Sequence, residues 1–220
     1  MKPKRVGPKR LELIEVGAGD KPIGIVGQGL RALRKRRGRT FVASDILAKP
    51  EETFRALGVK ELANTSILRE CSIQTLKRYK PESKDVIFGA YFLNGLLKFG
   101  ETRETIGQKI SSFFTEVKRV LKKNGRLIIV GDLMTADSYE RFGKSIGLKM
   151  HRIPISDDTA RMAGSEWMNH MSNPSKRLAI LLKNVQEGQA TRELYETEAK
   201  KLGLKSIDEL ARPFYFIFRK

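Results

Sequence analysis

The sequence predicts an α/β fold in which a doubly wound, mostly parallel sheet is covered by helices on both faces. Apolar segments of strand length alternate with amphipathic segments of helical length along most of the 220 residues. A glycine-containing turn with Gly17 and Gly19 directly follows the first expected strand. Residues 126–131, RLIIVG, form a continuous apolar run, which is typical of a strand buried on both faces.

The expected elements follow one another in regular order. The first strand covers residues 11–15, and the first helix covers residues 22–37 and ends at Gly38. Apolar side chains at helical spacing from Ile106 to Leu121 predict a long amphipathic helix. The elements after the first helix are strand 40–46, helix 50–57, strand 66–69, a short helix or loop at 74–79, strand 85–93, helix 105–122, a turn at Asn124-Gly125, strand 126–131, helix 138–146 and strand 148–155.

The C-terminal third departs from this alternation. The preferred interpretation is a single domain, residues 1–220, with a helical insertion at 157–210 and a closing strand at 213–220. The alternative places the last two strands within 203–220 and the insertion at 137–190. The expected insertion helices run from Asp157 or Asp158 to Met171, over 176–187 with Ser175 as N-cap, and over about 190–202, followed by a capping-box pattern at 206–209.

Composition excludes several classes of protein. A hydrophobic content of 40% supports a core, and no apolar run reaches the roughly 18–20 residues needed to span a bilayer. The basic N-terminal arm, residues 1–9, lacks the apolar region of a secretory signal. A single cysteine, Cys71, allows no internal disulfide and fits a reducing compartment, so a cytoplasmic location is expected.

The charge is the strongest compositional feature. The net charge is +18, and residues 1–50 hold 13 Lys and Arg against four Asp and Glu. Such a field attracts polyanions, and we therefore predict RNA or a ribonucleoprotein as a partner. A solvated basic face is the alternative explanation. The densest cluster consists of Arg31, Arg34, Lys35, Arg36, Arg37 and Arg39.

One constellation points to a cofactor. Glu15 stands two residues before Gly17, where a carboxylate repels a pyrophosphate but suits a cationic amine or sulfonium. Asp45 ends the second strand, 26 residues after Gly19, a place where dinucleotide-binding folds also carry an acidic residue. A nicotinamide fingerprint requires a third glycine where this chain has Pro22, and no P-loop pattern occurs.

These residues together resemble the class I S-adenosylmethionine-dependent methyltransferases, over about residues 10–155 and the last strand. The matching segments are 15–19 (EVGAG), Asp45, 85–91 (DVIFGAY) and 117–130 (VKRVLKKNGRLIIV). The resemblance implies the Rossmann-like methyltransferase fold, an enzyme, and S-adenosylmethionine as cofactor. Lys21 stands where many members carry a third glycine. The cofactor-binding residues that the resemblance implies are Glu15, Gly17, Ala18, Gly19, Asp45, Ile46, Glu70, Cys71, Ala90 and Tyr91.

The sequence defines the residues that would contact the methyl acceptor less clearly than those that would bind the cofactor. Tyr91 and Asn94 are the candidate catalytic residues, with the alternative that Tyr91 packs on the cofactor and Asn94 starts a helix. Trp167, Met168 and Met171 are expected to line a substrate cap, with core packing as the alternative. No metal site is expected, because the only histidines are far apart.

The predicted reaction is methyl transfer to a nucleophilic oxygen or nitrogen of RNA, by proximity and alignment. The alternatives are a small-molecule or protein methyltransferase and a catalytically silent RNA-binding module.

Overall fold

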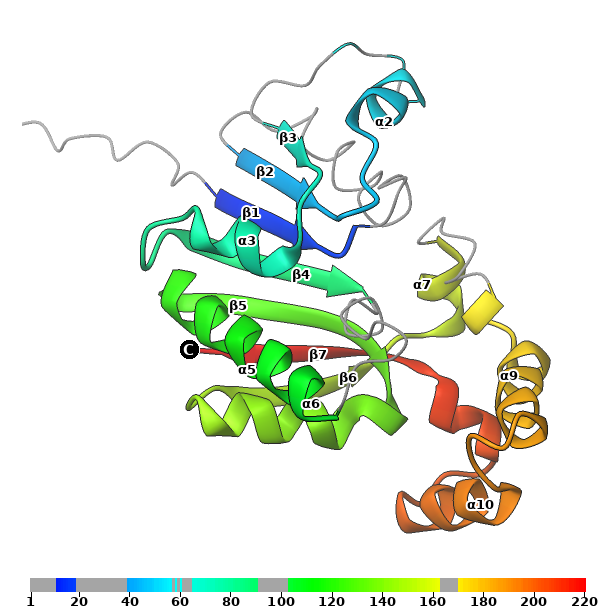
Figure 1. Ribbon diagram of the computed structural model, residues 1–220. Coiled ribbons are helices and arrows are strands. Elements are labelled where there is room, and N and C mark those ends of the chain that lie inside the picture. Colours follow the sequence, from blue (N-terminus) through cyan, green and yellow to red (C-terminus); the bar gives the residue numbers. More distant parts are fainter. Residues whose placement is uncertain are drawn as a thin grey trace, which may run out of the picture.

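The computed structural model describes residues 11–18, 39–56, 58, 60, 65–90, 103–162 and 170–220. Their centre is a seven-stranded sheet with the order β3-β2-β1-β4-β5-β7-β6 (Figure 1). The expected first helix, residues 22–37, lies outside the described residues. The strands are β1 (Leu11–Val16), β2 (Arg39–Ser44), β3 (Thr65–Leu68), β4 (Lys84–Ala90), β5 (Leu121–Asp132), β6 (Lys149–Pro154) and β7 (Pro213–Arg219).

The sheet is parallel except for its C-terminal strand. β7 pairs antiparallel with both β5 and β6, whereas the other pairs are parallel. β1 lies between β2 and β4, so the strand order reverses there, and ligands of open α/β sheets bind at such a point, beyond the carboxyl ends of the strands. The predicted fold class is confirmed.

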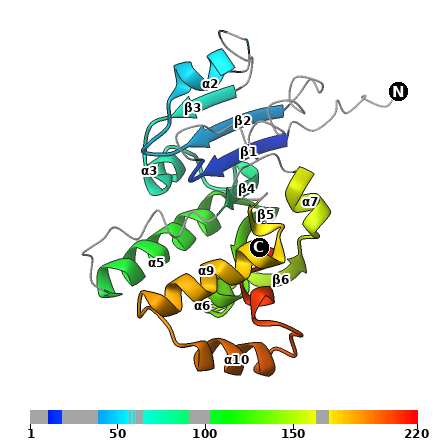
Figure 2. The same ribbon diagram turned by 90° about the vertical axis from the view of Figure 1, so that its right-hand side faces the viewer.

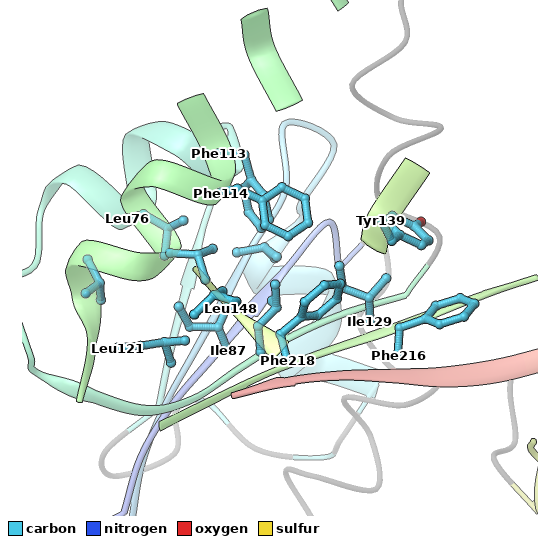
Figure 3. Packing of buried hydrophobic residues seen from close by; sticks show 14 of the residues in the cluster. Leu76, Ile87, Phe113, Phe114, Leu121, Ile129, Tyr139, Leu148, Phe216 and Phe218 are labelled. Atoms are coloured by element: carbon cyan, nitrogen blue, oxygen red, sulfur yellow. The ribbon is translucent and has the colours of Figure 1, made fainter. Parts of the chain in front are cut away.

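Three helices cover one face of the sheet, and a continuous aromatic and aliphatic core lies beneath them. These helices are α3 (Ser72–Lys77), α5 (Arg103–Val120) and α6 (Leu133–Ser145). Phe114 of α5 packs edge-on against Phe218 of β7, with ring centroids 5.4 Å apart, and both side chains are fully buried (Figure 3). On the opposite face, Phe54 of α2 (Pro50–Ala56) packs against a smaller cluster that includes Phe41 and Ile67.

The helices between β6 and β7 form a unit with its own core. They are α7 (Asp157–Met162), α9 (Pro174–Gln186), α10 (Arg192–Lys201) and the 3-10 helix η1 (Ile207–Ala211), and they lie beyond the carboxyl ends of the parallel strands (Figures 1 and 2). β6 pairs with β7 along its length, so the alternative placement of the last two strands within 203–220 is wrong.

Two expected helix caps are corrected. Asn173 is the N-cap of α9, and its Oδ1 accepts hydrogen bonds from the backbone N–H groups of Ser175 and Lys176; Ser175 is therefore inside the helix, which Pro174 opens. Ser206 makes no side-chain cap at η1.

The expected turn at Asn124-Gly125 lies within the span of β5. Pairing of β5 with β4 shifts between the pairs Lys84–Leu121 and Val86–Arg126, so these residues form an excursion inside one strand. α6 begins at Leu133, directly after β5 and five residues before the expected start. None of the helices in the described ranges is long and apolar enough to cross a membrane.

Candidate active site

The glycine turn after β1 is tied to the end of β2. Gly17 has φ of 66°, a conformation that glycine adopts without steric cost. The backbone N–H of Ala18 donates to the carbonyl oxygen of Ser44 at 3.1 Å, and the hydroxyl of Ser44 donates to the carbonyl oxygen of Glu15 at 3.5 Å. These two contacts hold the carboxyl ends of β1 and β2 side by side.

Glu15 is a buried carboxyl group without a counter-ion in the described part of the chain. It lies between Ala43 of β2 and Phe88 of β4 in the sheet, and the residue is only 5% exposed. Burial raises the pKa of Glu15 to about 8, because the charged form loses its contact with water. A ligand cation that reached this carboxylate would supply the missing charge, which fits the amino group or sulfonium of S-adenosylmethionine.

The next carboxylate follows β2. The backbone N–H of Asp45 donates to the carbonyl oxygen of Leu68. The side-chain Oδ1 of Asp45 accepts a hydrogen bond from the backbone N–H of Leu47 at 2.8 Å. Ile46 and Leu47 beside it are 47% and 60% exposed, which is unusual for large aliphatic side chains. A carboxylate flanked by exposed aliphatic groups suits a nucleoside, whose sugar offers hydroxyl groups and whose base offers an apolar face.

The end of β3 is braced by α3. The carboxylate of Glu70 accepts from the hydroxyl of Thr75 and from Nε of Arg78, both at 2.9 Å. Cys71 is the N-cap residue of α3 and is partly exposed. Because both carboxylate oxygens of Glu70 are already bonded, we expect this side chain to shape the edge of the site rather than to give up a bond to a ligand.

The structure brings most of the predicted cofactor residues to one edge of the sheet. These are Glu15, Gly17, Ala18, Asp45, Ile46, Glu70, Cys71 and the backbone of Ala90. Predicted residues that lie outside the described ranges are Gly19, Tyr91, Asn94, Trp167, Met168, Arg31, Arg34, Lys35, Arg36 and Arg37. Arg39 opens β2 and therefore lies at the opposite edge of the sheet.

Met171 is a core residue. It is 1% exposed and packs with Leu181 and Tyr195 in the core of the insertion, so its burial supports core packing and not the predicted contact with substrate. The sequence interpretation missed Ser44 and Leu47; their only signal is their position on either side of Asp45 at the end of a strand. In the described ranges, no group of three His, Cys, Asp or Glu side chains is placed to hold a metal ion.

Comparison with known proteins agrees with the fold. The methyltransferase domain model matches residues 22–129. A SAM-dependent methyltransferase from Archaeoglobus fulgidus is similar in structure, with a TM-score of 0.53 and 11% identity over 96% of this chain and 86% of that one. Phosphoethanolamine N-methyltransferase 2 from Haemonchus contortus, solved with phosphomonomethylethanolamine and S-adenosylhomocysteine, gives a TM-score of 0.51 and 15% identity over 98% of this chain. This chain spans half the length of that protein. No curated protein sequence matches the chain.

The strand order and the matched domain define a Rossmann-like methyltransferase. Residues 22–129 match the methyltransferase domain, and the sheet has the Rossmann-like fold of the class I S-adenosylmethionine-dependent methyltransferases that the sequence resembles. The buried carboxyl group of Glu15 and the turn at Gly17 fit S-adenosylmethionine, the cofactor of those enzymes.

Proposed function

We propose that this enzyme transfers a methyl group from S-adenosylmethionine to a nucleophilic oxygen or nitrogen atom of an RNA. The observation that carries the choice of RNA is the net charge of +18 on 220 residues. A field of this sign concentrates polyanions around the protein and accelerates their association. The single cysteine fits a reducing compartment, and we assign the protein to the cytoplasm on that ground.

The described residues have distinct tasks in this proposal. Gly17 lets the backbone approach the cofactor closely, Glu15 faces its cationic end, and Asp45 accepts hydrogen bonds from its ribose. S-adenosylmethionine supplies a methyl group on a sulfonium, which is a good leaving group. The protein therefore contributes mainly binding and alignment of the acceptor.

The insertion between β6 and β7 supports a substrate cap. Its helices lie at the carboxyl edge of the sheet (Figure 2), where ligands of this fold class bind. Trp167 and Met168 belong to the same insertion in the sequence, and we retain them as substrate-contacting candidates. Tyr91 and Asn94 remain the candidates that position the acceptor atom.

A small-molecule acceptor is the second candidate. The structural neighbour from Haemonchus contortus was solved with a small phosphorylated amine, and this chain aligns with it over 98% of its own length. At 15% identity this likeness concerns the fold, so the acceptor has to be measured.

The experiment is transfer of labelled methyl from S-adenosylmethionine to two acceptor sets. One set is unmodified transfer and ribosomal RNA transcribed in vitro, and the other is a panel of small amines, phosphorylated amines and phenols. We expect incorporation into RNA. Labelling of the small molecules alone would select the second candidate. RNA binding without cofactor binding and without labelling would select a silent RNA-binding module.

A further inference from the structure

Three cations lie in one row across three adjacent strands. Arg126 of β5 is paired with Arg219 of β7, and Arg219 is paired with Lys149 of β6. Side chains of directly paired residues point to the same face of a sheet, and neighbouring strands are about 4.8 Å apart. We call Arg126, Lys149 and Arg219 the basic row. All three residues are exposed.

The basic row faces away from the main core. Phe218 and Met150, which precede and follow members of the row, pack on the α5 and α6 side of the sheet. Because side chains alternate along a strand, Arg219 and Lys149 point to the opposite face. Arg126 is the first residue of β5 that pairs with β7, so the row lies at the edge opposite the candidate active site.

No carboxylate in the described part of the chain neutralises the row. The acidic groups at this edge already have their own cations: Glu12 pairs with Lys84, Glu82 with Lys220, Asp85 with Lys122 and Glu116 with Arg119. Lys123, another exposed lysine, lies in the excursion of β5, three residues before Arg126.

Like charges that face each other across paired strands destabilise a sheet. An anionic partner relieves this repulsion, and a row of cations at one strand spacing matches a chain of phosphates better than a single small anion. A lysine on an edge strand also prevents pairing with other sheets, which would explain Lys149 on β6. That role does not explain Arg126 and Arg219, which lie on inner strands.

We propose that the basic row binds the phosphate backbone of the RNA substrate and holds it at the edge remote from the methyl donor. This inference rests on the proposed function, since it names a second contact of the same substrate. An RNA bound there must extend around the molecule to reach the active site, so the surface serves affinity and not choice of the target atom.

The test compares two triple variants. R126Q/K149Q/R219Q removes the row, and K60Q/K77Q/K80Q removes three exposed lysines that lie outside the row and the insertion, so both lose the same charge. Binding of a short fluorescent single-stranded RNA is measured by anisotropy over a range of salt concentrations. Cofactor binding by calorimetry and circular dichroism checks that both variants fold.

We expect the row variant to bind RNA roughly ten- to fifty-fold more weakly at physiological ionic strength, with a salt slope shallower by about two units. The lysine control should change much less. In methylation assays, the row variant should raise KM for RNA and leave kcat unchanged. Equal losses in both triple variants would attribute binding to net charge alone and overturn the inference.

The two proposals can fail separately. If the wild type methylates RNA and the row variant has an unchanged KM, the inference is wrong and the proposed function stands. If the wild type neither binds nor methylates RNA, both the inference and the proposed function are wrong. Binding to anionic lipid vesicles in place of RNA would also overturn the inference.

Discussion

The guanidinium group of Arg177 donates two hydrogen bonds to Oδ2 of Asp208, at 2.9 Å from Nη2 and 3.2 Å from Nε. Nη1 of the same arginine donates to Asp157 at 3.1 Å and to the carbonyl oxygen of Met171 at 2.9 Å. Arg177 is only 3% exposed. One buried cation therefore joins α7, α9 and η1, and it is the main polar contact that organises the insertion.

We predict that Arg177→Leu destabilises the protein by about 3–5 kcal/mol, because it leaves the buried carboxylate of Asp208 without its cation. Trp167 is the sole tryptophan and belongs to the insertion, so urea unfolding followed by its fluorescence can report the change. The control is Arg192→Gln, whose exposed pair with Glu196 should contribute less than about 0.5 kcal/mol. Similar losses in both variants would contradict the assigned role of Arg177.

Glu15 predicts an unusual dependence of stability on pH. Its pKa is about 8 in the folded protein and near 4.5 when unfolded, so the folded state binds the proton more tightly. Its contribution to stability is therefore complete below about pH 4.5 and is lost as the pH rises to about 8, by up to about 1.4 kcal/mol per pH unit.

Urea unfolding of the cofactor-free protein between about pH 5 and pH 8 measures this effect. We expect Glu15→Gln to remove the slope relative to the wild type, and the exposed Glu51→Gln to retain it. Parallel curves for the wild type and Glu15→Gln would show that the carboxyl group is ionised in the fold.

Two substitutions of Asp45 separate its proposed contact with the ribose from its hydrogen bond in the local turn. Asp45→Ala removes the carboxylate and the acceptor for the N–H of Leu47, whereas Asp45→Asn keeps one oxygen as that acceptor, loses the charge and replaces the second oxygen with an NH2 donor. We expect Asp45→Ala to weaken S-adenosylmethionine binding by about ten- to one-hundred-fold, with a smaller loss for Asp45→Asn. Calorimetric titration with S-adenosylmethionine and S-adenosylhomocysteine is the measurement. Wild-type affinity in Asp45→Ala would place the ribose elsewhere.

Two helical glycines should respond in opposite ways to the same substitution. A Cβ on Gly143 of α6 would lie 2.5 Å from Cε1 of the buried Phe218, so Gly143→Ala should cost about 1–3 kcal/mol. A Cβ on Gly107 of α5 meets nothing within 4 Å, and Gly107→Ala should stabilise the helix by up to about 1 kcal/mol. Thermal unfolding of the two variants measures whether each substitution raises or lowers stability. A Gly143→Ala variant as stable as the wild type would mean that α6 can move away from β7.

The sequence by itself predicted the class of fold, and it placed most of the candidate cofactor residues at one edge of the sheet. Alternating strand and helix periodicity predicted the parallel sheet, and the position of Asp45 after a strand placed it correctly beside Gly17, because carboxyl ends of parallel strands share one edge. The same reasoning separated the closing strand 213–220 from the helices before it.

Only the tertiary structure decided which groups are buried and which are paired. The sequence cannot show that Glu15 is buried, that Met171 faces a core, or that Arg126, Arg219 and Lys149 share one row, since these depend on side chains brought together from distant segments. Local patterns report periodicity along the chain, whereas desolvation and cross-strand charge depend on distances between segments that the fold alone establishes.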